Sequence, residues 1–392
     1  MTDEVVPFRK GSSYNRRKGC EFLKLRLFFF CSNCEFVSGT PHQSPLTAHH
    51  RCAVLGTLGK STICSSLVGY ADLRRQLPLK GKPFGEGYKH MILGIDIGGT
   101  AVKMGLSDRN GVIYARHEAS VCFDGYQTPI LTTVIREAKG FLAAQNACIE
   151  GIGVSATGQV DDQIGAVIGT NGSIPNYEGA PIKQELEREF GVSVFVLNDA
   201  HAAALGECFM GRAKGASNVL MITLGTGVGG GIVLGGRILG GTRGIAGEMG
   251  HFTLYYGGRK CACGRSGCFE CYASATALVR LAEAHTGEAG LNGRIIFGRA
   301  NEGDEGMLSV IDRWTDDIAA GISGLVHIFN PEMVLIGGGV SAQEKLLMKP
   351  LRQKVLASVM PRFAEGLKIE AAALGNDAGL LGAVKFFMDR CG

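Results

Sequence analysis

The 392-residue sequence has little that would suit a nucleic-acid-binding or secreted protein. Its net charge of +4 arises in residues 1–90, which hold 14 Lys and Arg against 6 Asp and Glu. The remaining residues hold 26 against 30, so most of the chain lacks a broad basic surface for nucleic acid. No clean secretory signal is visible, and the 13 cysteines are therefore not expected to form a disulfide framework.

Long hydrophobic runs are also missing. The apolar stretch 22–31 is interrupted by Lys24 and Arg26 and is too short to span a bilayer. We therefore expect a cytoplasmic protein with no membrane partner. The composition, 45% hydrophobic and 19% charged, is that of an ordinary soluble enzyme, and the length is sufficient for two domains.

Residues 1–90 show no sustained helical or strand period and contain five prolines. The segment 55–62 is similar to a phosphate-binding loop, but Val54 stands where that motif needs its first glycine. We interpret residues 1–90 as a disordered or non-native extension, with the hypothesis that Met91 is the natural start of the protein.

From Met91 onward, apolar strand-like runs alternate with helical patterns. This alternation predicts an α/β fold in which helices cover both faces of a sheet. The expected strands are 91–96, 151–155, 195–197, 219–224, 232–234 and 333–336, and the expected helices begin at 200 or cover 275–285, 311–329 and 378–390.

Two glycine turns follow strands of this kind. In the first, Gly98 and Gly99 let backbone N–H groups face a phosphate, Thr100 adds a hydroxyl, and Asp96 could hold Mg²⁺. Lys103 follows closely. The turn at 225–231 repeats the style, which favours phosphate binding in a cleft over a pair of simple hairpins.

Two further features follow strands. Asn198 and Asp199 lie between a strand and a helix, where Asp199 could cap the helix or accept a proton from a substrate hydroxyl. The pair alone favours the cap. The glycine run 337–339 would let an adenine or a ribose approach the backbone, which is a weak signal taken singly.

A cluster of soft metal ligands predicts a tetrahedral zinc site. Its five candidates for four positions are His251, Cys261, Cys263, Cys268 and Cys271. Free buried thiols are the alternative. Because four protein ligands leave no open position, such a zinc ion would be structural.

Together these residues resemble the ROK family of sugar kinases and related repressors. The resemblance covers about residues 92–387, and its most specific part is 247–251 with 261–270. It implies His251, Cys261, Cys263 and Cys268 as zinc ligands, without Cys271. It also implies the actin-like (ribonuclease H-like) two-domain fold with an interdomain cleft. We expect residues 91–200 with 378–392 to form the smaller domain and residues 201–377 to form the larger.

The same resemblance implies roles for the site residues. Asp199 would be the catalytic base. The sugar would contact Thr157, Gly158, Asn171, Asn198, Glu248, His251 and Glu270. The nucleotide would meet Asp96, Gly98, Gly99, Thr100, Lys103, Thr226, Gly227, Gly338 and Gly339. One departure is His201, where many relatives carry Asn.

The resulting prediction is ATP-dependent phosphorylation of a hexose, with ATP, Mg²⁺ and a structural Zn²⁺, by a homodimer. Glucose is favoured, at its 6-hydroxyl, over N-acetylmannosamine or a β-glucoside, because the hydroxyl-binding set contains nothing shaped for an acetyl group. The rival is a sugar-responsive repressor. Residues 1–90 lack the two helical patterns joined by a short turn that a DNA reader requires.

Overall fold

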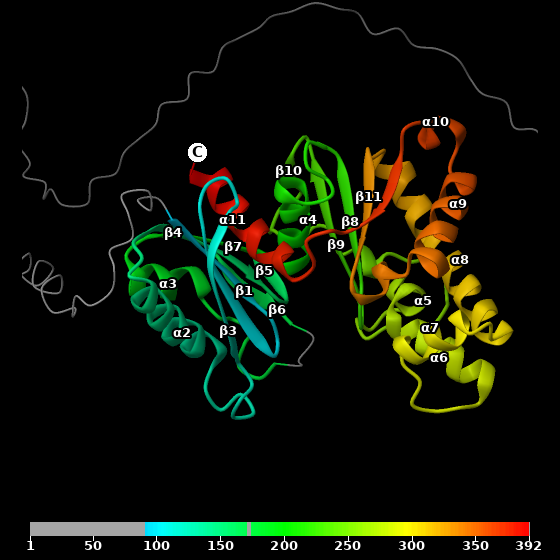
Figure 1. Cartoon of the computed structure of the whole chain (residues 1–392), viewed down its shortest axis with the longest axis horizontal. Helices are drawn as coiled ribbons and strands as arrows, with labels where there is room; N and C mark the ends of the chain where they lie inside the picture. The colour runs from blue at the N-terminus through cyan, green and yellow to red at the C-terminus, as the bar shows by residue number, and fades with distance from the viewer. Residues whose placement is uncertain (1–90, 171–173, 392) are drawn as a thin grey trace, which may run out of the picture. The chain divides into compact units, whose positions relative to one another are not determined.

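The computed structural model describes residues 91–170 and 174–391. The expectations for residues 1–90 and for Asn171 lie outside this part of the chain. Within it, the elements build two five-stranded sheets and a small two-stranded ribbon, with helices around them (Figure 1). The prediction of an α/β fold is confirmed.

The first sheet has its apolar β1 strand at the centre, buried on both faces. β1 pairs antiparallel with β2 and parallel with β4, which in turn pairs parallel with β7. Buried strands of this kind read as nearly continuous apolar runs, which explains why β1 and β4 were predictable. In spatial order the strands are β3 (Ile113–Ser120), β2 (Ala101–Ser107), β1 (Met91–Ile97), β4 (Ile149–Ala156) and β7 (Ser193–Asn198).

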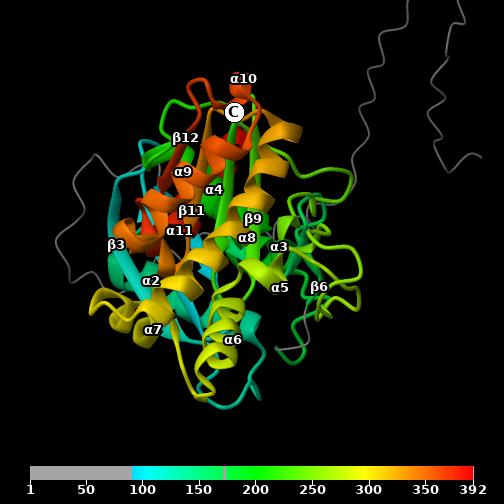
Figure 2. The ribbon, with the colours of Figure 1, turned by 90° about the vertical axis from the view of Figure 1, so that its right-hand side faces the viewer.

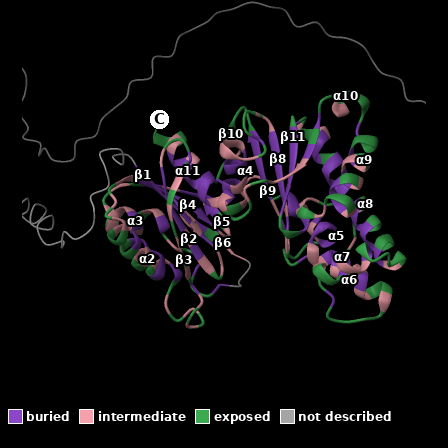
Figure 3. Ribbon diagram, in the orientation of Figure 1, coloured by how far each residue is buried: buried purple, intermediate pink, exposed green. Residues whose placement is uncertain are grey.

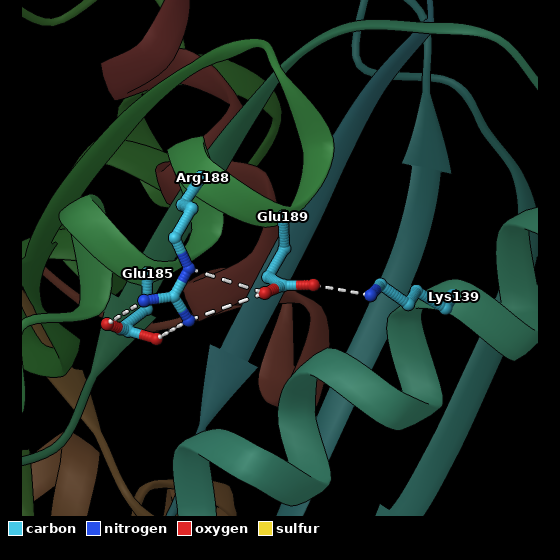
Figure 4. Close-up of polar contacts among 4 residues, drawn as sticks. All are labelled: Lys139, Glu185, Arg188 and Glu189. Carbon is cyan, nitrogen blue, oxygen red and sulfur yellow. Dashed lines mark hydrogen bonds and ion pairs between the residues drawn. The ribbon is translucent and has the colours of Figure 1, made fainter. Parts of the chain in front are cut away.

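Helices α2 (Ile130–Gln145) and α3 (Ile182–Phe190) cover one face of the first sheet and share its apolar core. On their outer sides, Arg188 pairs with Glu185 and Glu189 of its own helix, while Lys139 of α2 pairs with Glu189 (Figure 4). Exposed pairs of this kind contribute at most about 1 kcal/mol each. The two helices are therefore held mainly by their buried apolar faces.

The second sheet repeats this arrangement. β8 lies at its centre, pairs antiparallel with β9 and parallel with β11, and β11 pairs parallel with β12. In spatial order the strands are β10 (Arg237–Ile238), β9 (Val228–Leu234), β8 (Val219–Leu224), β11 (Met333–Gly337) and β12 (Lys368–Ala371).

One face of the second sheet packs on the long helix α8 (Glu305–Phe329), which lies in front of the strands in Figure 2. The surrounding helices are α5 (Glu270–Ala273), α6 (Ala275–Thr286), α7 (Gly293–Asn301), α9 (Lys349–Ser358) and α10 (Pro361–Ala364). Figure 3 shows that the central strands of both sheets are buried and that the covering helices have exposed outer sides.

Two helices lie between the sheets. α11 (Ala378–Cys391) packs on the first sheet and α4 (Asp199–Met210) on the second, and they also pack on each other (Figure 1). Their contact is so close that a Cβ atom at Gly382 would lie 1.7 Å from the Ala202 carbonyl oxygen. Glycine is therefore required at this crossing.

The remaining elements are the ribbon strands β5 (Gln159–Asp161) and β6 (Ala166–Gly169), with the short turns η1 (Met249–His251), η2 (Gly339–Ala342), η3 (Glu344–Met348) and η4 (Gly375–Asp377). All the strands and helices expected from the sequence exist. Strands β3, β5, β6, β10 and β12 and helices α2, α3, α5, α7, α9 and α10 were not predicted. Within residues 91–170 and 174–391, no helix is both long enough and apolar enough to cross a lipid bilayer.

Candidate active site

Residues from both sheets line one cavity of about 840 Å³, a volume that suits a small-molecule ligand. Most of the residues predicted to form the site meet there. Those that line the cavity are Asp96, Gly98, Lys103, Thr157, Gly158, Asn198, Asp199, Gly227, Glu248, His251, Cys263, Glu270 and Gly338.

The other predicted site residues lie beside the cavity or outside the described chain. Gly99, Thr100 and Thr226 belong to the two glycine turns and Gly339 belongs to the glycine run 337–339, but none of the four lines the cavity. Cys261 and Cys268 are buried and do not line the cavity.

The first glycine turn joins β1 to β2 and presents Asp96 at the end of β1. The Ser155 hydroxyl donates to Asp96 Oδ1 at 2.6 Å. Partial burial raises the pKa of the Asp96 carboxyl, and the Ser155 bond and the Lys103 charge oppose that shift. Because Ser155 takes only one carboxylate oxygen, the group keeps acceptor capacity for a ligand.

Asp199 lies at the start of α4, where β7 ends. The cap favoured from the sequence is wrong, because the N-cap is Asn198, whose side-chain oxygen accepts from the N–H groups of Ala200 and His201. The Asn198 amide also donates to Asp199 Oδ1 at 2.9 Å and to the Gly158 carbonyl at 2.8 Å. Asn198 therefore fixes the orientation of the Asp199 carboxylate toward the cavity.

The pKa of the Asp199 carboxyl is raised to about 6. Its side chain is exposed to the open cavity, yet protein atoms crowd the remaining sides and remove water there. The negative charge of Asp96 raises the pKa further, whereas the Ala200 N–H and the Asn198 side chain oppose the shift. A carboxyl group of this kind suits proton transfer near neutral pH.

The second glycine turn joins β8 to β9 and lies next to Glu270 of α5. Glu270 Oε2 accepts from the Val228 N–H at 3.1 Å, and the Cys261 thiol lies 3.8 Å from Glu270 Oε1. Glu270 thus connects the glycine turn to the cysteine cluster.

The cysteine cluster brings four possible ligand atoms within 4.8 Å of one another, from His251, Cys261, Cys263 and Cys268. Two of the sulfurs, in Cys263 and Cys268, lie 3.6 Å apart, and Cys261 Sγ lies 3.7 Å from His251 Nδ1. Ligands at tetrahedral Zn²⁺ are separated by about 3.8 Å for two sulfurs and about 3.6 Å for sulfur and nitrogen. These two distances therefore suit a tetrahedral zinc site.

Cys271 is not part of that group, because its thiol donates to the Lys260 carbonyl at 3.4 Å. His251 turns Nδ1 toward the cysteines and also lines the cavity. One histidine can thus serve the metal with one nitrogen and a ligand with the other.

Several residues around the site were missed in the sequence. The Tyr126 hydroxyl donates to the Gly99 carbonyl at 2.8 Å, and the Thr276 hydroxyl donates to the Thr226 carbonyl at the same distance. Tyr126 has φ 64°, a left-handed conformation that is strained for an aromatic residue. Because these partners are far apart in the sequence, no local pattern announces them.

Comparison with known proteins places the chain among sugar kinases and repressors. Residues 92–390 match the profile described as the ROK family. A glucokinase of Thermotoga maritima is 33% identical, over 78% of this chain and 99% of its own length. A glucokinase of Halalkalibacterium halodurans is 38% identical, over 74% and 92% respectively. A xylose repressor of Bacillus spizizenii is 27% identical, over 76% and 78%.

Among solved structures, a ROK family glucokinase from Streptomyces griseus in complex with glucose and AMPPNP has a TM-score of 0.63 at 32% identity. It is covered to 98% of its length, and this chain to 76%. This likeness, together with the two sheets of the same strand order, confirms the actin-like two-domain fold.

Proposed function

The chain belongs to the ROK family, and we propose on that premise that it is an ATP-dependent hexose kinase with Asp199 as its general base. One observation carries the proposal. The Asp199 carboxylate lines the same cavity as Gly98 of the first glycine turn and Gly227 of the second. An acceptor hydroxyl beside Asp199 would therefore face a nucleotide held by both turns.

The reaction is an in-line transfer of the γ-phosphoryl group. The sugar oxygen forms the new bond to phosphorus, the bond from phosphorus to the β-phosphate oxygen breaks, and ADP leaves. The hydroxyl proton passes to the Asp199 carboxylate, whose pKa of about 6 leaves it ionised at neutral pH. Catalysis of this kind depends mainly on positioning and charge stabilisation.

The nucleotide is assigned to the glycine turns. Gly98, Gly99 and Thr100 with Lys103 meet the phosphates from the first sheet, and Thr226 with Gly227 meets them from the second. Gly338 and Gly339 meet the nucleoside. Mg²⁺ bound with ATP would neutralise phosphate charge, and Asp96 fits it because this ion usually takes one or two protein carboxylates and keeps several waters.

The sugar is assigned to the residues around Asp199, and glucose at its 6-hydroxyl is the proposed acceptor. The contacts are Thr157, Gly158, Asn171, Asn198, Glu248, His251 and Glu270. Support comes from the glucokinases among the relatives. In the structure both amide hydrogens of Asn198 are used, so a sugar bond from Asn198 would replace one of its present bonds.

Zinc is assigned to His251, Cys261, Cys263 and Cys268, with a structural role. The proposed domains are residues 91–200 with 378–392, and residues 201–377. The packing of α11 on the first sheet and of α4 on the second supports this division. The homodimer and the cytoplasmic location stay predictions.

A panel of hexoses tests the proposal in an assay of sugar-dependent ADP release. Glucose is expected to give the highest kcat/KM, with N-acetylmannosamine and a β-glucoside as the alternatives. Asp199→Asn should lower kcat by about 10³-fold or more while glucose affinity changes little. Asp312→Asn, an exposed carboxylate on α8 paired with Lys354, is the matched control and should keep wild-type turnover.

The relatives also include repressors, so a sugar-responsive DNA-binding protein is the second candidate. That protein would bind sugar without releasing ADP. Sugar binding without turnover in the wild-type chain would therefore overturn the kinase proposal, and turnover that survives in Asp199→Asn would overturn the assigned base.

A further inference from the structure

His201, the departure noted in the sequence, is buried at the third position of α4, two residues after Asp199. Its Nε2 atom lies 2.5 Å from the Ala246 carbonyl oxygen. A carbonyl oxygen only accepts hydrogen bonds, so Nε2 must carry the proton and donate it. Burial lowers the pKa of the His201 imidazole, which favours the neutral ring with this single tautomer.

The segment 246–251 receives this bond and forms part of the cavity wall. It is a compact turn, because the Met249 N–H donates to the Gly247 carbonyl and the His251 N–H donates to the Glu248 carbonyl. Met249 is buried beneath it. The turn is therefore braced by its own backbone hydrogen bonds, and its Glu248 lines the cavity.

This turn is held at both ends. At one end His201 binds the Ala246 carbonyl, and the Ala246 N–H donates to the Gly240 carbonyl. At the other end His251 belongs to the cysteine cluster, and the Arg265 guanidinium donates to its carbonyl oxygen. Glu248 lies between the two attachments, so its position depends on both.

The close approach of the ring depends on glycine. Gly247 has φ 89°, and a Cβ atom there would lie 3.1 Å from His201 Nε2 and 3.2 Å from the Gly230 carbonyl oxygen. The backbone of the turn thus lies directly against the imidazole edge. A side chain of different reach at position 201 would leave the turn without this support.

We propose that His201 is a positioning residue that fixes the distance between the base Asp199 and the sugar-binding wall at Glu248. Helix α4 thereby positions Asp199 directly, and it positions the cavity wall at Glu248 through the His201 imidazole. The inference rests on the proposed function and adds a specificity determinant to it: the reach of residue 201 sets how tightly the cavity holds a hexose.

Three substitutions test whether the length of the side chain at position 201, and its ability to donate a hydrogen bond, set the position of the turn. The side-chain amide introduced by His201→Gln extends as far as the imidazole Nε2 and can donate to the Ala246 carbonyl. The side chain in His201→Asn is one bond shorter. The side chain in His201→Ala has no hydrogen-bond donor. Glucose affinity, measured by calorimetry without nucleotide, should fall about tenfold or more in His201→Ala, because a buried carbonyl loses its partner. We expect an intermediate loss in His201→Asn and nearly wild-type affinity in His201→Gln.

Nucleotide affinity should stay unchanged in all three variants, since the glycine turns do not contact residue 201 through this bond. His117→Ala is the control, because it removes a histidine that bonds Glu137 at 2.9 Å on the first sheet, outside the cavity lining. It should leave glucose affinity unaltered.

A ligand-free measurement keeps this test separate from the kinase assay. Hydrogen exchange at the Met249 and His251 amides should accelerate in His201→Ala and remain slow in His201→Gln. If the wild type failed to phosphorylate any hexose, this readout would still decide the role of His201, while the proposed function alone would fall.

The proposal is overturned if His201→Ala folds and keeps both wild-type glucose affinity and slow exchange. It is also overturned if glucose and nucleotide affinities fall together, which would indicate a general loss of structure. Should His201→Ala not fold, equal behaviour of His201→Gln and His201→Asn would contradict it, and better retention in His201→Gln would support it.

Discussion

The two sheets share one design. Each has a central strand with an antiparallel hairpin partner on one side and two parallel strands on the other, in the same spatial order. In each, a glycine turn follows the central strand. The registers place Thr223 of β8 where Asp96 stands in β1, and the neighbouring strand supplies Gly337 where the first sheet supplies Ser155.

The difference lies in the charges. The first sheet carries Asp96 at the end of β1 and leads into Asp199 after β7, whereas β12, in the place of β7, ends at Ala371. The same scaffold therefore serves two purposes. The first sheet supplies the carboxylates of Asp96 and Asp199 at its strand ends. The second supplies a glycine turn, the cysteine cluster and a wall of the cavity that includes Glu248 and Glu270.

One hydrogen-bonding feature is common to both glycine turns. The middle carbonyl, of Gly99 in the first turn and Thr226 in the second, accepts a hydroxyl hydrogen bond at 2.8 Å. The donors differ: Tyr126 comes from the loop after β3, and Thr276 comes from the first turn of α6. A fixed carbonyl also fixes the following N–H on the opposite side of the planar peptide.

Among the changes that compare the two sheets, removal of the Asp96 carboxylate should have the largest effect. Asp96→Asn is expected to lower kcat/KM for ATP by about 10²-fold or more, because the site loses the charge assigned to Mg²⁺. Thr223→Ala, at the matching place in the second sheet, should cost about threefold or less. Steady-state kinetics with varied ATP will measure both, and equal losses would contradict the assigned asymmetry.

Metal removal tests the cysteine cluster, a feature of the second sheet that the first sheet does not share. Cys268→Ser should weaken glucose binding by about tenfold or more, because His251 and the Glu248 turn lose one attachment. Treatment of the wild type with a chelator should do the same before the chain unfolds. Cys148→Ser, at an exposed thiol, is the control. Unchanged glucose affinity in metal-free protein would show that the cluster does not support the sugar site.

Loss of the hydroxyl hydrogen bond to the middle carbonyl of either glycine turn should give the smallest effect. Tyr126→Phe and Thr276→Val should each raise the KM for ATP about three- to tenfold with little change in the KM for glucose, since each frees one carbonyl without removing a charge. Tyr255→Phe is the control, because the Tyr255 hydroxyl bonds Asp317 instead of a glycine turn. An effect in only one of the two variants would show that the turns are not held equivalently.

What could be predicted follows from what is local in the sequence. β1 and β8 are continuous apolar runs that end in glycine turns, and both were expected. The first half of β9, residues 228–231, was missed because three consecutive glycines hide a strand, and β3 was missed because it alternates half-buried and exposed residues. Helix α9 was missed because its apolar pattern is weak: only Leu351 and Val355 are buried, and charged residues stand next to both in the sequence.

The site shows the same limit. The cysteine cluster could be predicted because its residues are close in sequence. Asp199 could be predicted because it follows a strand. The cap was assigned to Asp199 because Asn and Asp both favour that position, and only the backbone shows that Asn198 occupies it. Contacts such as His201 with Ala246 join segments 45 residues apart and depend on the tertiary structure.

The pH dependence of kcat/KM for glucose tests the base most directly. A base must be ionised, so the raised pKa of Asp199 predicts that activity falls tenfold per pH unit below about 6 and is level above it. In Asp199→Asn the residual activity should lack this acid limb. A profile that is level down to about pH 4.5 in the folded wild type, or an acid limb that persists in Asp199→Asn, would contradict the account.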